Sequence, residues 1–179
     1  MKATALSQWI ARVDAAEYGL CRRLNRGAAW IVPRRIFQVA SRLGDGVIWY
    51  VVILALPVLY GRGALRPAVV MAITGVAGVA LYKLLKHTLV RERPFITHST
   101  IDLGMTPLDR YSFPSGHTLH AVCFTLQITA HYPALGAVLI PLTLLIAGSR
   151  VVLGLHYPTD VLAGAAIGLS LGALGLSLS

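Results

Sequence analysis

Long apolar runs that end in short polar segments fill the chain from about residue 46 onward. Two stretches, Tyr111–Ser149 and Val161–Ser179, contain no Asp, Glu, Lys or Arg at all. Crossing the ~30 Å hydrocarbon core of a bilayer takes ~20 mostly apolar residues. Because lipid cannot satisfy free backbone groups and the runs lack strand-type alternation, each run is expected to be a helix. The pattern therefore predicts a polytopic membrane protein.

We expect about five transmembrane helices, packed as an all-α bundle. Pro57 interrupts the first of them, and a turn at residues 131–133 separates the third from the fourth. In the last run Gly164, Gly168 and Gly172 recur at every fourth position, which lets two helix backbones approach closely. The predicted spans cover residues 46–61, 67–85, 117–130, 134–152 and 158–179.

The first 43 residues have a different pattern, with half of the sixteen basic residues and no long apolar run. A cleavable signal peptide is therefore not expected. Instead we expect an amphipathic helix in the membrane interface and a second one opened by Pro33, with a loosely ordered basic tail as the alternative. The chain then divides into an interfacial segment, 1–43, and a transmembrane domain, 44–179. The apolar faces would carry Leu6, Trp9, Ile10, Val13, Leu20 and Leu24, then Ile36, Phe37, Ala40 and Leu43.

Composition supports the membrane assignment and indicates which class of binding partner to expect. The 179 residues are 56% hydrophobic and 13% charged, about half the charged fraction of a soluble domain. The formal charge of +9 could suggest nucleic acid, but the basic residues flank apolar runs. Anionic lipid headgroups are therefore the expected partner, and nucleic acid is not. Cys21 and Cys123 lie far apart without metal-ligand spacing, so both are expected to be unpaired.

Three polar clusters lie at the ends of the apolar runs, in the patterns K-x6-R-P, P-S-G-H and S-R-x5-H-x3-D. They supply three fixed cations, which could neutralise the charge of a phosphate without a metal ion. A serine hydroxyl and a glycine N–H at a helix start would add hydrogen bonds to the same anion. The predicted phosphate-binding residues are Lys86, Arg93, Ser115, Gly116 and Arg150.

Two histidines in the same clusters could carry the bond-making steps. Asp160 follows His156 by four residues, and Pro158 suits the first position of the last helix. A carboxylate bonded to one ring nitrogen would leave the other free as a nucleophile, and His117 would protonate the leaving alcohol. Each residue alone also has a structural interpretation, such as a snorkelling lysine. Ionisable groups at the ends of apolar runs are, however, costly to keep without a use.

Together the three clusters resemble the signature of the type-2 phosphatidic acid phosphatase superfamily, over about residues 44–171. That superfamily also includes vanadium haloperoxidases and soluble bacterial acid phosphatases. The resemblance implies a phosphohistidine on His156, with Asp160 as its partner and His117 as the general acid. For the phosphatases of the family it implies no metal requirement, so no cofactor is expected. Compared with six-span lipid phosphatases the chain lacks the first span, and the basic segment stands in its place.

A lipid phosphate is the expected substrate, since a site at the water–lipid boundary can accept a headgroup while the tails stay in the bilayer. The resemblance implies undecaprenyl diphosphate, phosphatidic acid or phosphatidylglycerol phosphate, and the loop from Phe95 to Phe113 could select among them as a lid. A lipid phosphotransferase using the same histidine and a non-catalytic lipid-phosphate-binding protein are the alternatives. A haloperoxidase fits less well, because the aqueous portion is small.

Alternating helix directions would bring all three clusters and the basic segment to one membrane face. The opposite face would carry only Arg62, Arg66 and the turn at His131. The positive-inside rule then places the site in the cytoplasm. The family resemblance implies instead an extracytoplasmic site in the inner membrane of a bacterium, so both orientations stay open.

Overall fold

The computed structural model describes the backbone of residues 5–179 and the side chains of this range except residues 5–7 and 9–11. Within these residues the chain is largely helical, and the only β-type pairing is an isolated bridge between Glu92 and Tyr111. The expected all-α fold is confirmed. The elements are α1 (Ala5–Asn25), η1 (Arg26–Ala29), α2 (Ile31–Leu43), α3 (Val47–Tyr60), η2 (Arg62–Ala64), α4 (Leu65–Leu89), α5 (Pro94–Thr97), α6 (Gly116–His131), η3 (Pro133–Leu135), α7 (Gly136–Val152) and α8 (Pro158–Leu178).

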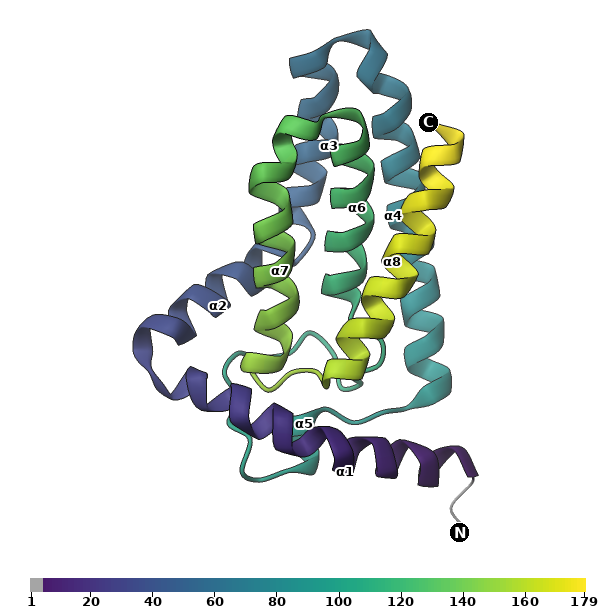
Figure 1. The fold of residues 1–179 in the computed structure, drawn as a ribbon. Coiled ribbons are helices and arrows are strands. Elements are labelled where there is room, and N and C mark those ends of the chain that lie inside the picture. The colour runs from purple at the N-terminus through teal and green to yellow at the C-terminus, as the bar shows by residue number, and fades with distance from the viewer. Residues whose placement is uncertain (1–4) are drawn as a thin grey trace.

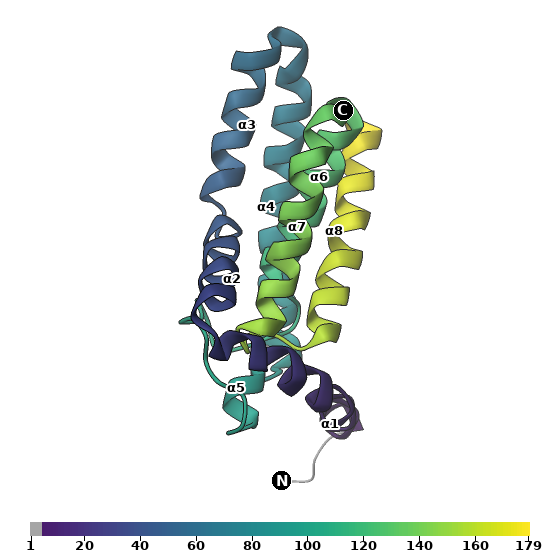
Figure 2. The same ribbon diagram turned by 60° about the vertical axis from the view of Figure 1, so that its left-hand side comes forward.

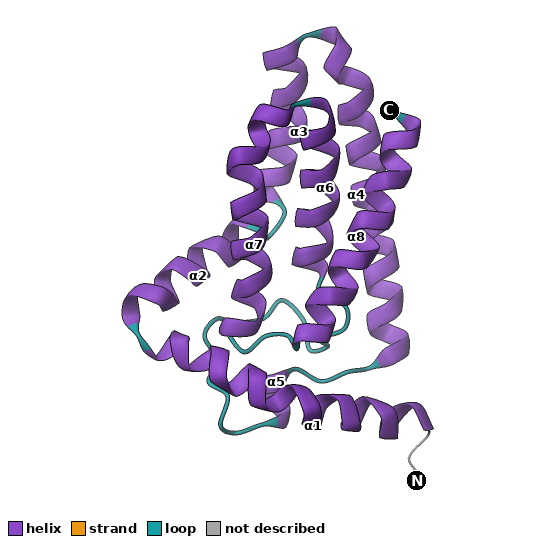
Figure 3. Cartoon of the chain, viewed as in Figure 1, coloured by secondary structure: helices purple, strands orange, loops and turns teal. Residues whose placement is uncertain are grey.

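Five helices, α3, α4, α6, α7 and α8, run alongside one another as a bundle (Figure 1, Figure 3). Each corresponds to one of the predicted apolar runs, with ends displaced by at most a few residues. α1 lies across the lower end of the bundle in Figure 1, near α5 and the loops that follow α4 and α7. One end of the molecule therefore carries the three polar clusters together with the N-terminal segment, as predicted.

Three helical segments are long and apolar enough to cross a membrane unaided, Arg62–Leu89, Pro133–Val152 and Pro158–Leu178. α2 and α3 meet that standard only as a pair, bent by 54° at the break between them (Figure 1). Seen from the side, α2 continues below α3 along one edge of the bundle (Figure 2). With 14 and 16 residues, α3 and α6 are roughly 21 and 24 Å long at 1.5 Å per residue. The multi-pass membrane bundle is confirmed, but α3 and α6 are shorter than full-length spans.

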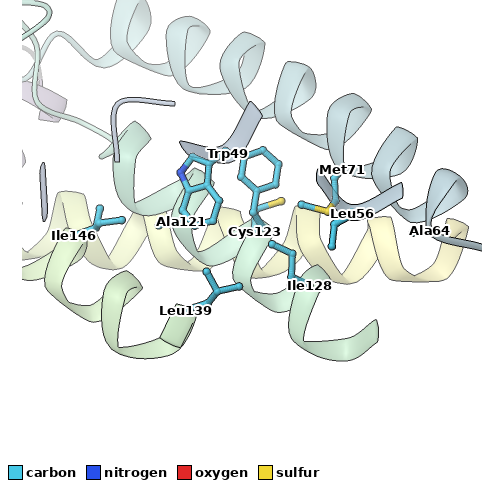
Figure 4. Close-up of a cluster of buried hydrophobic side chains, with 10 residues drawn as sticks. Trp49, Leu56, Ala64, Met71, Ala121, Cys123, Ile128, Leu139 and Ile146 are labelled. Carbon is cyan, nitrogen blue, oxygen red and sulfur yellow. The ribbon is translucent and has the colours of Figure 1, made fainter. Parts of the chain in front are cut away.

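The core of the bundle consists of apolar side chains from α3, α4, α6 and α7 (Figure 4). Trp49 of α3 packs against Phe124 of α6, with ring centroids 5.4 Å apart, and both side chains are buried. Cys123 lies in the same core as a free thiol, and Cys21 is free and buried in α1. The prediction that both cysteines are unpaired is confirmed.

α8 packs closely against α6 through the glycines that the sequence singled out. A Cβ atom on Gly164 would lie 2.5 Å from the carbonyl oxygen of Ser115, and one on Gly168 would lie 2.4 Å from that of Leu119. These distances leave no room for a side chain, so the approach of the two backbones depends on glycine. Because Ser115 belongs to the P-S-G-H cluster, this contact also fixes the position of that cluster.

Replacing Gly168 with alanine should lower the free energy of unfolding by about 1–3 kcal/mol, as overpacking does in other cores. Alanine has the better helix propensity, but the added Cβ would meet backbone that cannot rotate aside. Gly19 of α1 is the matched control, because nothing lies within 4 Å of a Cβ built there. Thermal unfolding in detergent should show a lower midpoint for Gly168→Ala than for Gly19→Ala. Equal midpoints would contradict the close contact of α6 with α8.

The N-terminal segment forms two helices beside the bundle, as predicted, but α2 begins at Ile31 rather than at Pro33. Pro33 lies within the first turn of α2, where a backbone N–H would have no helical acceptor, so proline is tolerated there. Leu20 and Leu24 of α1 are 49% and 41% exposed and so are available to lipid. Three other residues of the predicted apolar face have side chains outside the described residues, namely Leu6, Trp9 and Ile10.

Candidate active site

The three polar clusters converge at the lower end of the bundle in Figure 1. Lys86 lies in the last turn of α4, the P-S-G-H cluster begins α6, Arg150 lies in the last turn of α7, and His156 follows in the loop before α8. The predicted charged residues of the site are largely buried. Because buried charges are stable only with partners, the contacts of each residue define what the site can bind.

Lys86 and Arg93 share one carboxylate, that of Asp109. Lys86 Nζ lies 2.8 and 2.7 Å from its two oxygens, Oδ1 and Oδ2. Arg93 donates from Nη2 to Oδ1 at 2.8 Å and from Nε to the backbone carbonyl of Asp109 at 2.9 Å. Burial raises the pKa of Asp109, but hydrogen bonds from Lys86 and Arg93 outweigh this and hold the pKa below its ordinary value. An ionised carboxylate therefore pairs with two of the predicted phosphate-binding cations.

Arg150 is buried at the end of α7, and its Nη1 donates to the hydroxyl of Ser41 from α2. Its Nε has no hydrogen-bond partner in the described part of the protein. The backbone N–H groups of Leu155 and His156 donate to the Arg150 carbonyl at 3.0 and 2.9 Å. These bonds hold the loop that carries His156 against the end of α7, beside a guanidinium with a free donor.

His156 is 1% exposed and has a different neighbour at each ring nitrogen. Nε2 lies 3.2 Å from Arg93 Nη1, and Nδ1 lies 3.5 Å from Asp160 Oδ2. Burial, followed by the charges of Arg93 and Arg150, lowers the pKa of His156 well below its ordinary value. A guanidinium can only donate, so Nε2 is the ring nitrogen that accepts a hydrogen bond, and Nδ1 faces the carboxylate. The Asp160 contact is longer than the hydrogen bond that the sequence suggested.

Other donors occupy the oxygens of Asp160. Oδ2 accepts the backbone N–H of Tyr157 at 2.8 Å, and Oδ1 accepts Nη1 of Arg91 at 2.6 Å. Arg91 in turn binds Asp14 and Glu17 of α1, at 2.5 and 2.8 Å from its Nη2. α1 is thus linked through one arginine to the carboxylate beside His156. The division of the chain at residue 43 stays a prediction.

The P-S-G-H cluster forms the start of α6. Ser115 is the N-cap, and its Oγ lies 3.5 Å from the backbone nitrogen and 3.0 Å from the hydroxyl of Thr118. Gly116 is the first residue of the helix, where a backbone N–H has no intrahelical acceptor. His117 follows, with Nε2 2.6 Å from Oδ1 of Asp45 in the turn between α2 and α3. His117 and His156 therefore each lie beside a carboxylate.

An apolar pocket of about 380 Å³ opens beside His117 between α3, α4 and α6. Asp45 and His117 line its polar end, and the remaining lining is mostly apolar, including Ile53, Val76 and Phe124. Ile53 lies in the middle of α3 and Val76 in the middle of α4. The polar cluster and the apolar pocket thus meet at His117.

The positive charge of the site comes from side chains, those of Lys86, Arg93 and Arg150. The described residues contain no group of three or more His, Cys, Asp or Glu side chains arranged to hold a metal ion. Three cations can offset the charge of a bound phosphate and the charge that develops as it is attacked. The donor set therefore fits an oxyanion.

Among the contacts that sequence reasoning missed are those made by the side chains of Ser41, Asp45, Arg91 and Asp109. The chain has only seven Asp and Glu residues, and a carboxylate in so apolar a chain needs a partner. That rarity could have marked Asp45 and Asp109 as candidate partners of the cationic clusters. Ser41 carries no comparable signal in the sequence.

Residues 63–179, more than half of the chain, match the family described as the PAP2 superfamily. The chain belongs to the PAP2 superfamily. The family predicted from the three clusters is therefore confirmed.

Relatives of this PAP2 chain agree with the match. Undecaprenyl-diphosphatase BcrC of Bacillus subtilis is 33% identical over 129 residues, which cover 72% of this chain and 66% of BcrC. The structure of LpxE of Aquifex aeolicus matches this chain with a TM-score of 0.75 at 24% identity, and the match covers 90% of this chain and 95% of the LpxE chain. The structure of a transmembrane PAP2 type phosphatidylglycerolphosphate phosphatase of Bacillus subtilis matches with a TM-score of 0.73 at 22% identity. That match covers 97% of this chain and 93% of the phosphatase chain. At these identities the two structures establish a shared fold.

The chain spans 66%, 40% and 51% of the lengths of the first curated relatives that it matches. The PAP2 match contains all three polar clusters, with Arg91 and Asp109. Ser41, Asp45 and the acidic residues of α1 precede it. In this PAP2 protein the N-terminal segment and the turn before α3 therefore supply contacts to the site from outside the matched region.

Proposed function

We propose that this PAP2 protein is a membrane lipid phosphatase that acts through a phosphohistidine without a metal ion. The observation that carries the proposal is the position of His156, whose Nε2 faces Arg93 within a group of three cations. BcrC is named an undecaprenyl-diphosphatase, and one fold neighbour is named a phosphatidylglycerolphosphate phosphatase. These names support a phosphorylated lipid as the substrate class.

In the first step the phosphoryl oxygens bind Lys86, Arg93 and Arg150, with the Ser115 hydroxyl and the Gly116 N–H as further donors. His156 Nε2 attacks phosphorus with its lone pair, and the bond from phosphorus to the leaving lipid oxygen breaks. His117 gives its proton to that oxygen. The nearby Asp160 carboxylate favours the tautomer with the proton on Nδ1, which keeps Nε2 free.

In the second step a water molecule attacks the phosphohistidine. His117 takes one proton from the water, the new oxygen–phosphorus bond forms, and the bond from phosphorus to Nε2 breaks. Inorganic phosphate leaves, and His156 is again neutral. Both steps place the negative charge of the transferring group against the same three cations, whose positions are fixed before the reaction begins.

The apolar pocket beside His117 supports a lipid rather than a soluble phosphate ester. A chain in the pocket between α3, α4 and α6 would place its terminal oxygen at the polar end, where His117 lies. The phosphoryl group would then point toward His156 and the cations. Undecaprenyl diphosphate is the first candidate because BcrC is named for it, with phosphatidic acid and phosphatidylglycerol phosphate as the others.

The N-terminal segment supports a site at the surface of a bacterial cell membrane. Trp30, Ile31 and Val32 are exposed at the elbow between η1 and α2. The basic residues Arg26 and Arg34 lie close by in the sequence. An apolar elbow flanked by arginines is suited to insertion among anionic lipid headgroups. The same lipids would hold α1 and α2 over the site.

Purified protein should release inorganic phosphate from at least one of undecaprenyl diphosphate, phosphatidic acid and phosphatidylglycerol phosphate in detergent. Because the fixed cations replace a metal, EDTA should leave the rate unchanged. Orthovanadate, which mimics phosphate, should inhibit. Phosphate release measured across this panel, with and without EDTA, tests both the activity and the metal-free mechanism.

Two results would count against the proposal. Release of no phosphate from any of the three lipids would contradict a lipid phosphatase. Loss of activity on chelation that added Mg²⁺ restores would contradict the metal-free mechanism while leaving the activity in place.

A further inference from the structure

Asp109 occupies the cations that the proposed function assigns to phosphate. Its two carboxylate oxygens accept three hydrogen bonds from the side chains of Lys86 and Arg93, at 2.7–2.8 Å. Both cationic side chains are buried, whereas the Asp109 side chain is 41% exposed. A carboxylate with both oxygens on a lysine and an arginine makes the contacts that two oxygens of a phosphate would make.

We propose that Asp109 is a specificity-determining residue, an internal carboxylate that competes with phosphate for Lys86 and Arg93 and admits only groups of higher negative charge. The proposal rests on the proposed function, because it takes these cations as part of the phosphate site. It assigns a role to a residue outside the three clusters.

Competition follows from geometry and charge. Lys86 Nζ and Arg93 Nη2 cannot keep 2.7–2.8 Å contacts with Asp109 and also bind two phosphate oxygens in the same place. Burial of these cations without an anion would be costly, and the carboxylate removes that cost. Substrate phosphate must therefore replace the carboxylate with contacts at least as favourable.

Asp109 contacts the cations through its side chain, on a segment that is held by its backbone. The Gly104 N–H donates to the Leu153 carbonyl at 3.0 Å, the Ser112 N–H donates to the Arg91 carbonyl at 2.8 Å, and Tyr111 forms the isolated bridge with Glu92. The three contacts of the carboxylate with Lys86 Nζ and Arg93 Nη2 are made by the side chain alone. Rotation of the Asp109 side chain therefore breaks the contacts that phosphate replaces and leaves the backbone contacts of the segment in place.

The charge of the competing groups decides which lipids can displace Asp109. A terminal phosphate of a monoester or diphosphate approaches two negative charges near neutral pH. A phosphodiester headgroup carries one negative charge, as the carboxylate does, and gains no electrostatic advantage over it. Asp109 would therefore exclude the phosphodiester lipids that surround the site in the bilayer, while a phosphomonoester or diphosphate enters.

The test compares the wild type with Asp109→Asn, which keeps the shape of the side chain and removes its charge. Asp102→Asn is the control, since Asp102 lies in the same loop, is exposed and uses its backbone for its contacts to Asn25. We expect Asp109→Asn to bind inorganic phosphate about tenfold more tightly, which corresponds to about 1.4 kcal/mol. We also expect vesicles of phosphatidylglycerol, a phosphodiester, to slow the release of phosphate from the lipid substrate by Asp109→Asn. The rates of the wild type and of Asp102→Asn should not change.

Binding is measured as the phosphate-induced rise in the thermal unfolding midpoint, which does not depend on turnover. Unchanged or weaker phosphate binding by Asp109→Asn would overturn the proposal, as would equal resistance of all three proteins to phosphatidylglycerol. Should Asp109→Asn fold only when phosphate is present, competition for the same cations is supported. Should it fold under neither condition, Asp109 is a structural residue and the proposal fails.

The same data separate this inference from the proposed function. Tighter phosphate binding by Asp109→Asn in a protein that turns over no lipid would support the competing carboxylate and contradict the phosphatase. If Asp109→Asn turns over lipid normally but does not bind inorganic phosphate more tightly, the phosphatase function stands. Asp109 then has no role in the selection of substrates.

Discussion

Replacing His156 with alanine should lower phosphate release from the lipid substrate by at least about a hundredfold, because removal of a nucleophile leaves only the weak catalysis of the surrounding binding groups. His156 Nε2 is the ring nitrogen that faces Arg93. Without it no phosphoryl-enzyme can form. The measurement is the initial rate of phosphate release from the best substrate of the lipid panel, at matched amounts of folded protein.

Controls separate loss of the nucleophile from loss of the fold. His156→Gln keeps more of the buried volume, so its thermal midpoint should stay closer to the wild type while its rate falls equally. His131→Ala, at the opposite end of the bundle beside Ser179, should retain the wild-type rate. Retention of more than a few per cent of the rate by a folded His156 variant would show that another group attacks phosphorus.

Replacing His117 with alanine should affect poor leaving groups more than good ones. A lipid alkoxide needs a proton as it departs, so its cleavage should fall by about 10²–10⁴-fold, the usual contribution of a general acid. An activated aryl phosphate needs little protonation, so its first step should be much less affected. Rates with both substrates, together with alkaline quenching, which preserves an acid-labile phosphohistidine, give the comparison.

The two histidines should leave different chemical signatures. His117→Ala should either retain measurable aryl phosphate cleavage or accumulate acid-labile phosphate on the protein, because the water-activating step becomes slow. His156→Ala should do neither. Acid-labile phosphate on His156→Ala would assign the nucleophile elsewhere. An equal loss on both substrates for His117→Ala, with no trapped intermediate, would remove His117 from both proton transfers.

The helical bundle could be predicted because its signals are local. An uncharged run such as Tyr111–Ser149 has few structural options in lipid, and the turn at residues 131–133, with its proline, divides it into two helices. The spacing of the glycines in α8 predicted a close contact with another helix, but the sequence does not show that this helix is α6. The positions of α3 and α6 agree with the predicted runs to within one residue at each end, although neither helix alone has the length of a full span.

The candidate site was predictable only in part. There is a physical reason why some of its residues could be predicted from the sequence and their partners could not. Lys86, Ser115 and Arg150 stand at helix ends, and alternating helix directions bring those ends together. Their partners come from segments with no periodic or motif signal. Asp109 follows Lys86 by 23 residues, and Ser41 precedes Arg150 by 109. Contacts across such separations depend on how loops and helix breaks pack.

Local sequence features are enough to predict the membrane bundle, the single face that carries the clusters, and the residue types for binding and attacking a phosphate. These follow from apolar run length, helix direction and short-range spacing. Two contacts depend instead on how distant segments pack: Arg91 rather than His156 holds Asp160 most closely, and Asp109 lies on Lys86 and Arg93. The reason is that a buried charge pairs with the counter-charge that packing brings within hydrogen-bond distance, whatever their separation along the chain.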